Sequence, residues 1–212
     1  MLLSSTTKRI INKYCFLVIK NLLICILIIF PLSVNAQNIS TIGFKGGGNV
    51  STLGPSGAGY SSKLGYHLGL FTTTRFYQEL GVQLELLVSQ QGARSEFLSD
   101  LKLKYTYLTV PLLANVYFIE SAAIEGGLQV GYLLKATQID DGDKYDLYNE
   151  VRNIDLSGIL GINYNKPFGS IGFRYLIGIN NTNRAAPNSE IRYTNKVFQV
   201  YIAKTLFTSE NK

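Results

Sequence analysis

The stretch ELGVQLELLVSQQ, residues 79–91, alternates between apolar and polar side chains with a period of two. Its even positions from Leu80 to Val88 are apolar, whereas Gln83 and Glu85 stand at odd positions. Successive side chains of a strand point to opposite faces, so the carboxylates and amides share one face and the leucines the other. Residues 122–135 repeat the pattern. We interpret both stretches as strands of one closed barrel whose outer surface contacts lipid.

The first 36 residues have the features of an export signal. A basic segment without acids precedes the apolar run at 22–32, which is shorter than the ~20 residues of a membrane-spanning helix. Val34-Asn35-Ala36 approximates a small-residue cleavage site. We therefore predict a cleaved signal peptide at 1–36 and an outer-membrane barrel domain at 37–212, with an uncleaved anchor as the alternative.

Removal of this segment changes the charge and the cysteine content. It carries four of the 20 Lys and Arg residues and none of the 14 Asp and Glu residues, so the net charge falls from +6 to +2. A nucleic-acid partner then has no support. Cys15 and Cys25 also leave, and the mature chain has no disulfide, thiolate metal site or cysteine nucleophile.

The mature chain contains eight alternating segments joined by loops that are long and short in turn. The predicted strands cover residues 39–50, 63–76, 79–91, 104–118, 122–135, 154–164, 170–180 and 193–207. Tilted membrane strands need about 10 residues each, and membrane barrels place short turns on the periplasmic side and long loops outside. The sequence thus predicts an all-β fold, an eight-stranded antiparallel up-and-down transmembrane β-barrel.

The period of two also assigns side chains to the two surfaces of the barrel. The predicted lipid-facing residues include Leu84, Leu86, Leu112, Leu128, Val130 and Phe173. The predicted polar cluster of the interior comprises Lys45, His67, Glu85, Glu125, Gln129 and Arg174. An eight-stranded barrel is just wide enough for side chains, so the buried charges must pair with one another and the interior is filled. Lys135 falls on the polar face and Lys204 on the apolar face, while Pro111 cannot donate to a ladder.

Five stretches resemble the PorT-like outer-membrane β-barrel family of Bacteroidetes. They are GFKGGGN at 43–49, ELLVSQQG at 85–92, YLTVPLL at 107–113, GLQVGYLL at 127–134 and VFQV at 197–200. The resemblance spans nearly the whole mature chain and implies an eight-stranded outer-membrane barrel, with Pro111 in the family's fourth strand. The name-giving member of the family is tied to gliding and type IX secretion, but nothing in this sequence selects that role. Thr109 stands where the family often has an acid.

The remaining sequence features are better explained by structural roles than by a catalytic, metal or phosphate site. His67 is the only histidine and could act as a base with a serine and Glu85, but a hydrogen-bonded interior histidine is the simpler interpretation. Asp140-Asp141-Gly142-Asp143 lacks the spacing of a calcium loop, and the glycines at 43–48 are followed by neither the Lys-Ser/Thr pair nor the helix of a phosphate loop. An aromatic girdle is predicted near the periplasmic strand ends, at Phe76, Tyr77, Tyr117, Phe118, Phe168 and Phe207.

The sequence therefore predicts a non-enzymatic outer-membrane barrel that acts structurally or as an interaction platform, through extracellular loops or periplasmic partners. A lipid-modifying enzyme and a small solute channel remain alternatives, and a soluble lipocalin-like barrel is a more remote one. The expected partners are outer-membrane lipids and other envelope or secretion proteins, with no nucleic acid. We expect a monomer and neither a cofactor nor a metal.

Overall fold

The described part of the chain is built entirely from β-strands and their connections. The computed structural model describes residues 39–54, 59–97, 101–182 and 193–210, and all regular elements in these ranges are strands. Among the described residues, no helix is long and apolar enough to cross a membrane. The predicted signal peptide at 1–36, with Cys15 and Cys25, lies outside these residues.

Eight long strands follow the alternating segments of the sequence. They are β1 (Ile39–Leu53), β3 (Lys63–Arg75), β4 (Leu80–Ser95), β5 (Lys102–Ile119), β6 (Ala122–Asp140), β8 (Ile154–Lys166), β9 (Gly169–Gly178) and β10 (Asn195–Glu210). Two short strands, β2 (Tyr60–Ser61) and β7 (Asp143–Asp146), add to β4 and β6.

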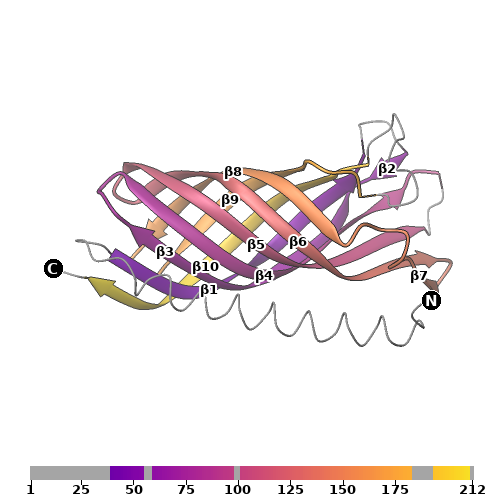
Figure 1. The fold of residues 1–212 in the computed structure, drawn as a ribbon, viewed down its shortest axis with the longest axis horizontal. Helices are drawn as coiled ribbons and strands as arrows, with labels where there is room; N and C mark the ends of the chain where they lie inside the picture. Colours follow the sequence, from indigo (N-terminus) through magenta and orange to yellow (C-terminus); the bar gives the residue numbers. More distant parts are fainter. Residues whose placement is uncertain (1–38, 55–58, 98–100, 183–192, 211–212) are drawn as a thin grey trace, which may run out of the picture.

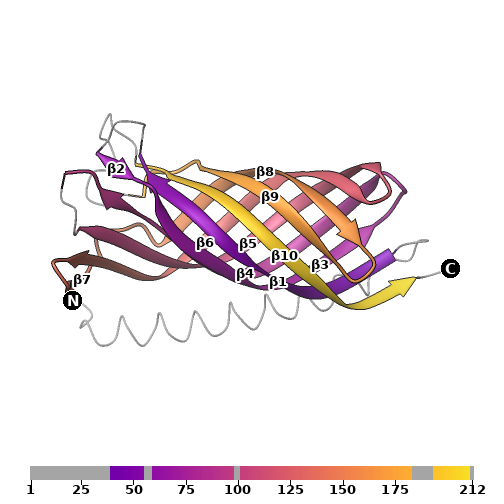
Figure 2. The same cartoon turned by 180° about the vertical axis from the view of Figure 1, so that it is seen from behind.

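The eight long strands close into a barrel. Each pairs antiparallel with the next long strand along the chain, and β1 pairs with β10 over its whole length, from Ile39 opposite Glu210 to Leu53 opposite Asn195. Figures 1 and 2 show the tilted strands from two sides. Closure leaves no long strand with an unpaired edge, which is the condition for a sheet to span hydrocarbon. The predicted all-β, eight-stranded antiparallel barrel is confirmed.

The two ends of the barrel differ. At one end the connections are short: Ile119 pairs with Ala122, and Lys166 with Gly169, across two-residue turns. The other end carries the long connections together with β2 and β7 (Figures 1 and 2). Short turns mark the periplasmic end of such barrels, so β2 and β7 lie at the extracellular end.

Several strands continue into segments that the sequence predicts as loops. The loop expected at residues 136–153 instead holds the end of β6 and all of β7, and the loop expected at 92–103 holds the last residues of β4 and the first of β5. Ladder pairing beyond the membrane explains the difference, because Lys102–Thr106 pair with residues 135–139. These positions break the simple apolar alternation by which the sequence marks strands.

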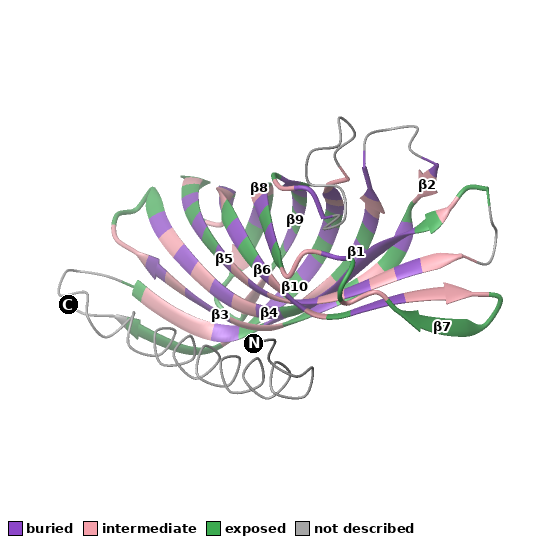
Figure 3. Cartoon of the chain, turned by 45° about the vertical axis from the view of Figure 1, so that its right-hand side comes forward, coloured by how far each residue is buried: buried purple, intermediate pink, exposed green. Residues whose placement is uncertain are grey.

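Side chains alternate between interior and exterior along the strands, visible as bands of buried and exposed residues in Figure 3. On β6, Leu128 is 63% exposed, whereas Glu125 is fully buried. Leu112, Val130 and Phe173 are also exposed, while Leu84 and Leu86 are half-buried on the same face as Leu112. The exterior is therefore apolar, the arrangement that a lipid environment requires.

A β-bulge changes the facing of one charged residue, Lys135. A register shift in the β5–β6 ladder, between Thr106 opposite Lys135 and Tyr107 opposite Leu133, leaves Leu134 unpaired. Lys135 is consequently exposed, and its predicted place on the interior face is wrong. Lys204 lies on the exterior opposite Gly169, near the periplasmic end, where its long side chain can reach the interface.

Pro111 interrupts one ladder without breaking the barrel. It is buried and pairs with Gln129 on β6. On the other side, the β4–β5 register runs up to Leu84 opposite Leu112 and resumes at Leu87 opposite Thr109. The missing N–H of proline thus costs pairing on one side only.

Candidate functional site

The polar cluster predicted for the interior lies inside the barrel. Exposure of its members is 3% or less. They are Lys45 on β1, His67 on β3, Glu85 on β4, Glu125 and Gln129 on β6, and Arg174 on β9. Each occupies an inward position of the alternation, so the cluster follows directly from the strand register. The structure divides these residues between a central ion network and a second polar layer closer to the extracellular end.

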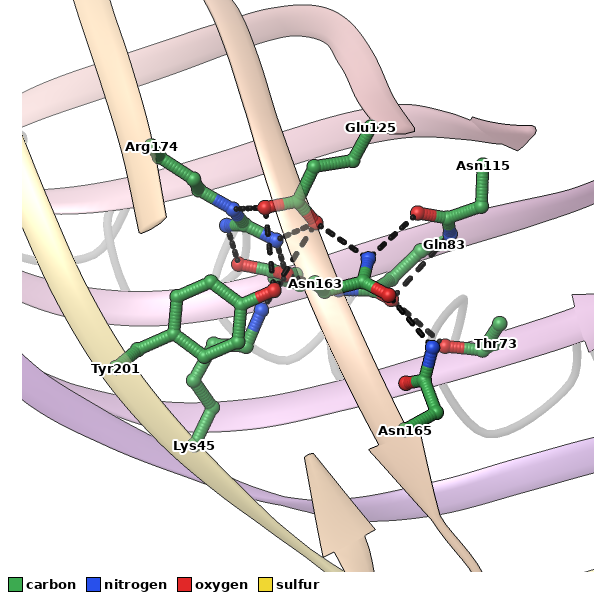
Figure 4. Close-up of polar contacts among 10 residues, drawn as sticks. Lys45, Thr73, Gln83, Asn115, Glu125, Asn163, Asn165, Arg174 and Tyr201 are labelled. Atoms are coloured by element: carbon green, nitrogen blue, oxygen red, sulfur yellow. Dashed lines mark hydrogen bonds and ion pairs between the residues drawn. The ribbon is translucent and has the colours of Figure 1, made fainter. Parts of the chain in front are cut away.

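The central ion network comprises Lys45, Glu85, Glu125, Arg174 and Tyr201. The Arg174 guanidinium donates Nη1 and Nη2 to the Glu85 carboxylate at 2.8 and 2.7 Å, and Nε and Nη2 to the Glu125 carboxylate at 2.5 and 2.8 Å. Lys45 Nζ donates to Glu85 Oε1 at 2.6 Å. Figure 4 shows Arg174 and Glu125 meeting above Tyr201 and Lys45. Five strands contribute one side chain each to a single contact group.

The charges of this network balance. Two cations face two carboxylates. Each buried charge therefore has a partner, without which its burial would cost several kcal/mol. Tyr201 donates its hydroxyl to Glu125 at 3.1 Å, and its ring lies 3.7 Å from Lys45 Nζ and 4.7 Å from Arg174 Cζ. Tyr201 thus contacts both cations with its ring and the Glu125 carboxylate with its hydroxyl.

Amide side chains continue the network toward the periplasmic end. Gln83 donates to Glu85, and Asn163 donates to Glu125 at 3.3 Å and to Asn115 at 3.3 Å. Asn165 in turn donates to Asn163 at 2.6 Å. This layer adds hydrogen bonds to both carboxylates on the periplasmic side of the charges.

His67 belongs to the second polar layer, and no catalytic triad forms around it. Its Nδ1 lies 2.7 Å from Asn49 Oδ1, and Asn49 donates to Ser89 Oγ at 3.1 Å. The carboxylate of Glu85 is occupied by Arg174 and Lys45 instead. His67 is 2% exposed, so a lipid substrate has no access to the ring. Ser89 stands opposite His67 and both side chains contact Asn49, but Glu85 is held by Arg174 and Lys45, so the base, serine and acid form no hydrogen-bonded triad.

Asp155 lies in the same layer. Its carboxylate accepts hydrogen bonds from Ser157 Oγ at 2.8 Å and Asn195 Nδ2 at 2.7 Å, and the residue is 2% exposed. Gln129 is buried here too, and within the described chain its Nε2 has no hydrogen-bond partner. Neutral donors, rather than a cation, therefore solvate the Asp155 carboxylate.

An apolar cap closes the extracellular end of the lumen. The cap consists of a cluster of buried residues and of the partly buried residues that pack against this cluster at the rim. Its residues are Leu53, Ala93, Leu103, Tyr105, Tyr107, Leu133, Ala136 and Val151, with Tyr60, Leu101, Leu147 and Tyr148 packed against them. Tyr60 meets the Tyr193 ring edge-on at 6.0 Å, and burial together with Tyr193 raises the pKa of Tyr60. The lumen is filled from its charged centre to this cap.

The other candidate sites form ordinary structure. Asp141 and Gly142 have positive φ, 46° and 91°, and make the tight turn between β6 and β7, with Asp140 opposite Asp143. No group of three metal-ligating side chains occurs among the described residues. The glycine run at 43–48 lies within β1. Of the predicted girdle, Tyr77, Phe118, Phe168 and Phe207 are well exposed.

Sequence reasoning did not name Tyr201 and Asn195 as members of the interior. Tyr201 stands between the exposed residues Val200 and Ile202, so its position in the alternation does place it inward. An aromatic residue was expected on the girdle or in a core, and the period of two alone does not reveal that Tyr201 contacts both cations.

Comparisons with known proteins agree with this architecture. A family model described as "Outer membrane protein beta-barrel domain" matches residues 35–184. Neisserial surface protein A has a similar structure, with a TM-score of 0.54, 11% identity and coverage of 79% of this chain and 99% of that one. Ail of Yersinia pestis gives 0.49 at 16% identity, covering 80% and 99% of the two chains. OprG from Pseudomonas aeruginosa gives 0.37 at 18% identity, covering 83% and 97%. No curated protein sequence matches the chain.

Proposed function

The chain belongs to the outer membrane protein beta-barrel domain family, and from this premise we propose that it works as a sealed scaffold, presenting an interaction surface outside the cell. It is an integral β-barrel of the bacterial outer membrane. The observation that carries the proposal is the filled lumen, in which the central ion network and the apolar cap lie one above the other. A solute channel would need a continuous polar path instead.

The extracellular ends of β4, β5 and β6 supply the surface. These strands have 16, 18 and 19 residues, whereas a membrane strand needs about 9–11. The excess forms, with β7, a wall of sheet that stands beyond the membrane (Figure 1). Tyr145 on β7 is 53% exposed, and Phe97 after β4 is 84% exposed. Rigid sheet with exposed aromatic side chains is suited to binding a protein or glycan partner.

Conductance and thiol labelling test the seal. We expect the purified chain to be silent in planar bilayers, and Ser157→Cys, buried in the lumen, to resist a membrane-impermeant maleimide. Lys144→Cys on exposed β7 is the matched control and should react at once. The mature chain has no other cysteine, so labelling is unambiguous. Steady conductance, or rapid labelling of Ser157→Cys, would refute the sealed scaffold.

A photo-crosslinker tests where partners bind. Placed at Tyr145, it should capture an envelope or surface partner that the same group at Phe168, on the periplasmic turn, does not. The reverse pattern would move the interaction to the periplasmic side.

Three finer assignments belong to the same proposal. We propose that residues 1–36 are a cleaved signal, which predicts Gln37 as the first residue of the purified protein. We place the chain in the PorT-like branch found in Bacteroidetes, on the five stretches described above, with secretion as one role for its partners. We propose no catalytic role, so His67→Ala should leave the lipid A profile of the outer membrane unchanged.

A further inference from the structure

Basic residues gather on the outer surface of the wall, directly above the lipid-facing belt. Arg94 on β4 stands opposite Lys102 on β5, which stands opposite Ile139 on β6, which stands opposite Lys144 on β7. Directly opposed residues of an antiparallel ladder share one face. Lys104 follows two residues after Lys102 on that face. Four cations thus lie on one sheet surface, with Arg94, Lys102 and Lys104 next to one another and Ile139 between Lys102 and Lys144.

The facing of this surface is outward. Lys102 and Lys104 continue the even series of β5 that includes the exposed residues Leu112 and Val116, while Leu103 and Tyr105 between them are buried in the cap. Arg94 is exposed. We call Arg94, Lys102, Lys104 and Lys144 the basic patch.

The basic patch has little compensating charge. The four cations stand against two nearby acids, Asp146 on β7, opposite Thr137, and Glu96, two residues after Arg94. Within the described ranges, the ion pairs all belong to the central ion network, and none involves the patch. At the extracellular end of β3, burial and the charges of Lys104 and Arg94 lower the pKa of Lys63. Like charges held together on a rigid sheet favour an anionic ligand.

The height of the basic patch above the apolar band indicates which kind of anion it meets. On β5 the exterior series from Phe118 to Leu108 spans ten residues, which at about 3.3 Å per residue and a tilt near 40° is about 25 Å, the thickness of the apolar band. Lys104 lies four residues further, about 10 Å above that band by the same geometry, at the level of lipid headgroups. The outward face at this depth meets the outer leaflet.

We propose that the basic patch binds the phosphate groups of a phosphorylated glycolipid of the outer leaflet, of the lipid A type. The acyl chains of the lipid would pack on the exposed apolar side chains below, of which Leu112 is one. Lys102 and Lys104, on one strand and one face, would hold a phosphate between them and Arg94. This inference depends on the outer-membrane location of the barrel and is independent of whether the lumen is sealed.

Binding of lipid A to the folded chain in neutral detergent micelles tests the proposal. The probes are diphosphoryl lipid A and the same molecule without its phosphates, and the variants are Lys102→Gln/Lys104→Gln and, as a matched control, Lys166→Gln/Lys204→Gln at the periplasmic end. A charge near an anionic surface contributes about fivefold in affinity, so the first variant should bind diphosphoryl lipid A about 25-fold more weakly. The control should change affinity less than about twofold.

The remaining outcomes each decide the question. A heat-modifiable gel shift in both variants shows that both fold, and Arg94→Gln provides a third, single-charge variant if either does not. Equal weakening in the two variants, or equal binding of the lipid without phosphates, overturns the proposal. It is also overturned if a soluble sulfated oligosaccharide displaces lipid A at equal concentration, because the patch would then serve a ligand outside the membrane.

Discussion

Replacing Arg174 with methionine tests whether the central ion network behaves as one balanced unit. Arg174 donates four hydrogen bonds, two to Glu85 and two to Glu125. Methionine is comparable in length and carries no charge, so in the variant both carboxylates share Lys45 alone. The cavity change is small, and the main effect is electrostatic.

The size of that effect follows from the two ways in which the folded variant can respond. Keeping a buried, uncompensated carboxylate costs about 3–5 kcal/mol. Taking up a proton instead costs about 3.7 kcal/mol at pH 7, because an ordinary glutamic acid has a pKa of about 4.3. The cheaper route limits the loss, so we expect Arg174→Met to lower the free energy of unfolding by about 3–4 kcal/mol at pH 7.

The proton gives the variant a distinctive pH dependence. Above about pH 4.3 the folded variant binds one proton more than its unfolded chain, so its stability rises as the pH falls. The slope is about 1.4 kcal/mol per pH unit, and about 2.7 kcal/mol of the deficit should be recovered between pH 7 and pH 5. A loss caused by altered packing alone would not depend on pH in this way.

Urea titration of the refolded barrel in detergent micelles, followed by circular dichroism and by the heat-modifiable gel shift, measures both quantities. Arg75→Met is the matched control. Arg75 stacks on Tyr117 at the periplasmic end, with 4.0 Å from its Cζ to the ring, and its loss should cost less than about 1 kcal/mol without this slope. Adding Glu125→Gln to Arg174→Met restores one cation to one carboxylate and should remove the slope. The reasoning would be refuted if Arg174→Met lowered the free energy of unfolding by less than about 1 kcal/mol, or by the same amount at pH 5 and pH 7.

Three further predictions concern the lipid face, the β6–β7 turn and the packing around Tyr201. Leu112→Arg places a charge on the lipid face at a cost of about 2–4 kcal/mol and should abolish the heat-modifiable band, which Leu112→Phe should retain. Gly142→Val forces a β-branched residue to adopt φ of 91°, costing about 1–3 kcal/mol locally, and should speed hydrogen exchange in β7 while the barrel midpoint in urea stays unchanged. A Cβ at Gly172 would lie 2.3 Å from Tyr201 Cζ, so Gly172→Ala should lower the urea midpoint, and Tyr201→Leu should then add less loss than it does in the native chain.

The barrel could be predicted from the sequence because lipid imposes a simple rule. Each apolar side chain on the outer surface alternates with an inward one, so parity along a single strand places Leu128 outside and Glu125 inside without knowledge of their neighbours. The rule fails where a strand gains a residue. Leu134 shifts the register, and Lys135 thereby leaves the interior. A bulge depends on the paired strand, which local alternation does not contain.

The contacts within the lumen were beyond the same rule. Parity places Arg174 and Glu85 inside, but the choice of partners depends on the relative heights of strands that are 89 residues apart in the chain. The extracellular wall was missed for another reason. Beyond the membrane both faces of a strand meet water or the cap, so at Lys102–Tyr105 the charged side chains face outward and the apolar ones inward, the reverse of the pattern within the membrane.

The five strands that supply the central ion network include the first and the last of the barrel, β1 and β10. A nascent sheet that ends before β9 holds two acids against one base, and an incomplete sheet that lacks β1 holds two acids against Arg174 alone. A sheet that includes β1 to β9 already carries both cations and both carboxylates, and closure of the seam between β1 and β10 adds the Tyr201 ring, which contacts both cations. The complete network therefore exists only in the closed barrel, so its contacts distinguish the finished ring from a partly assembled sheet.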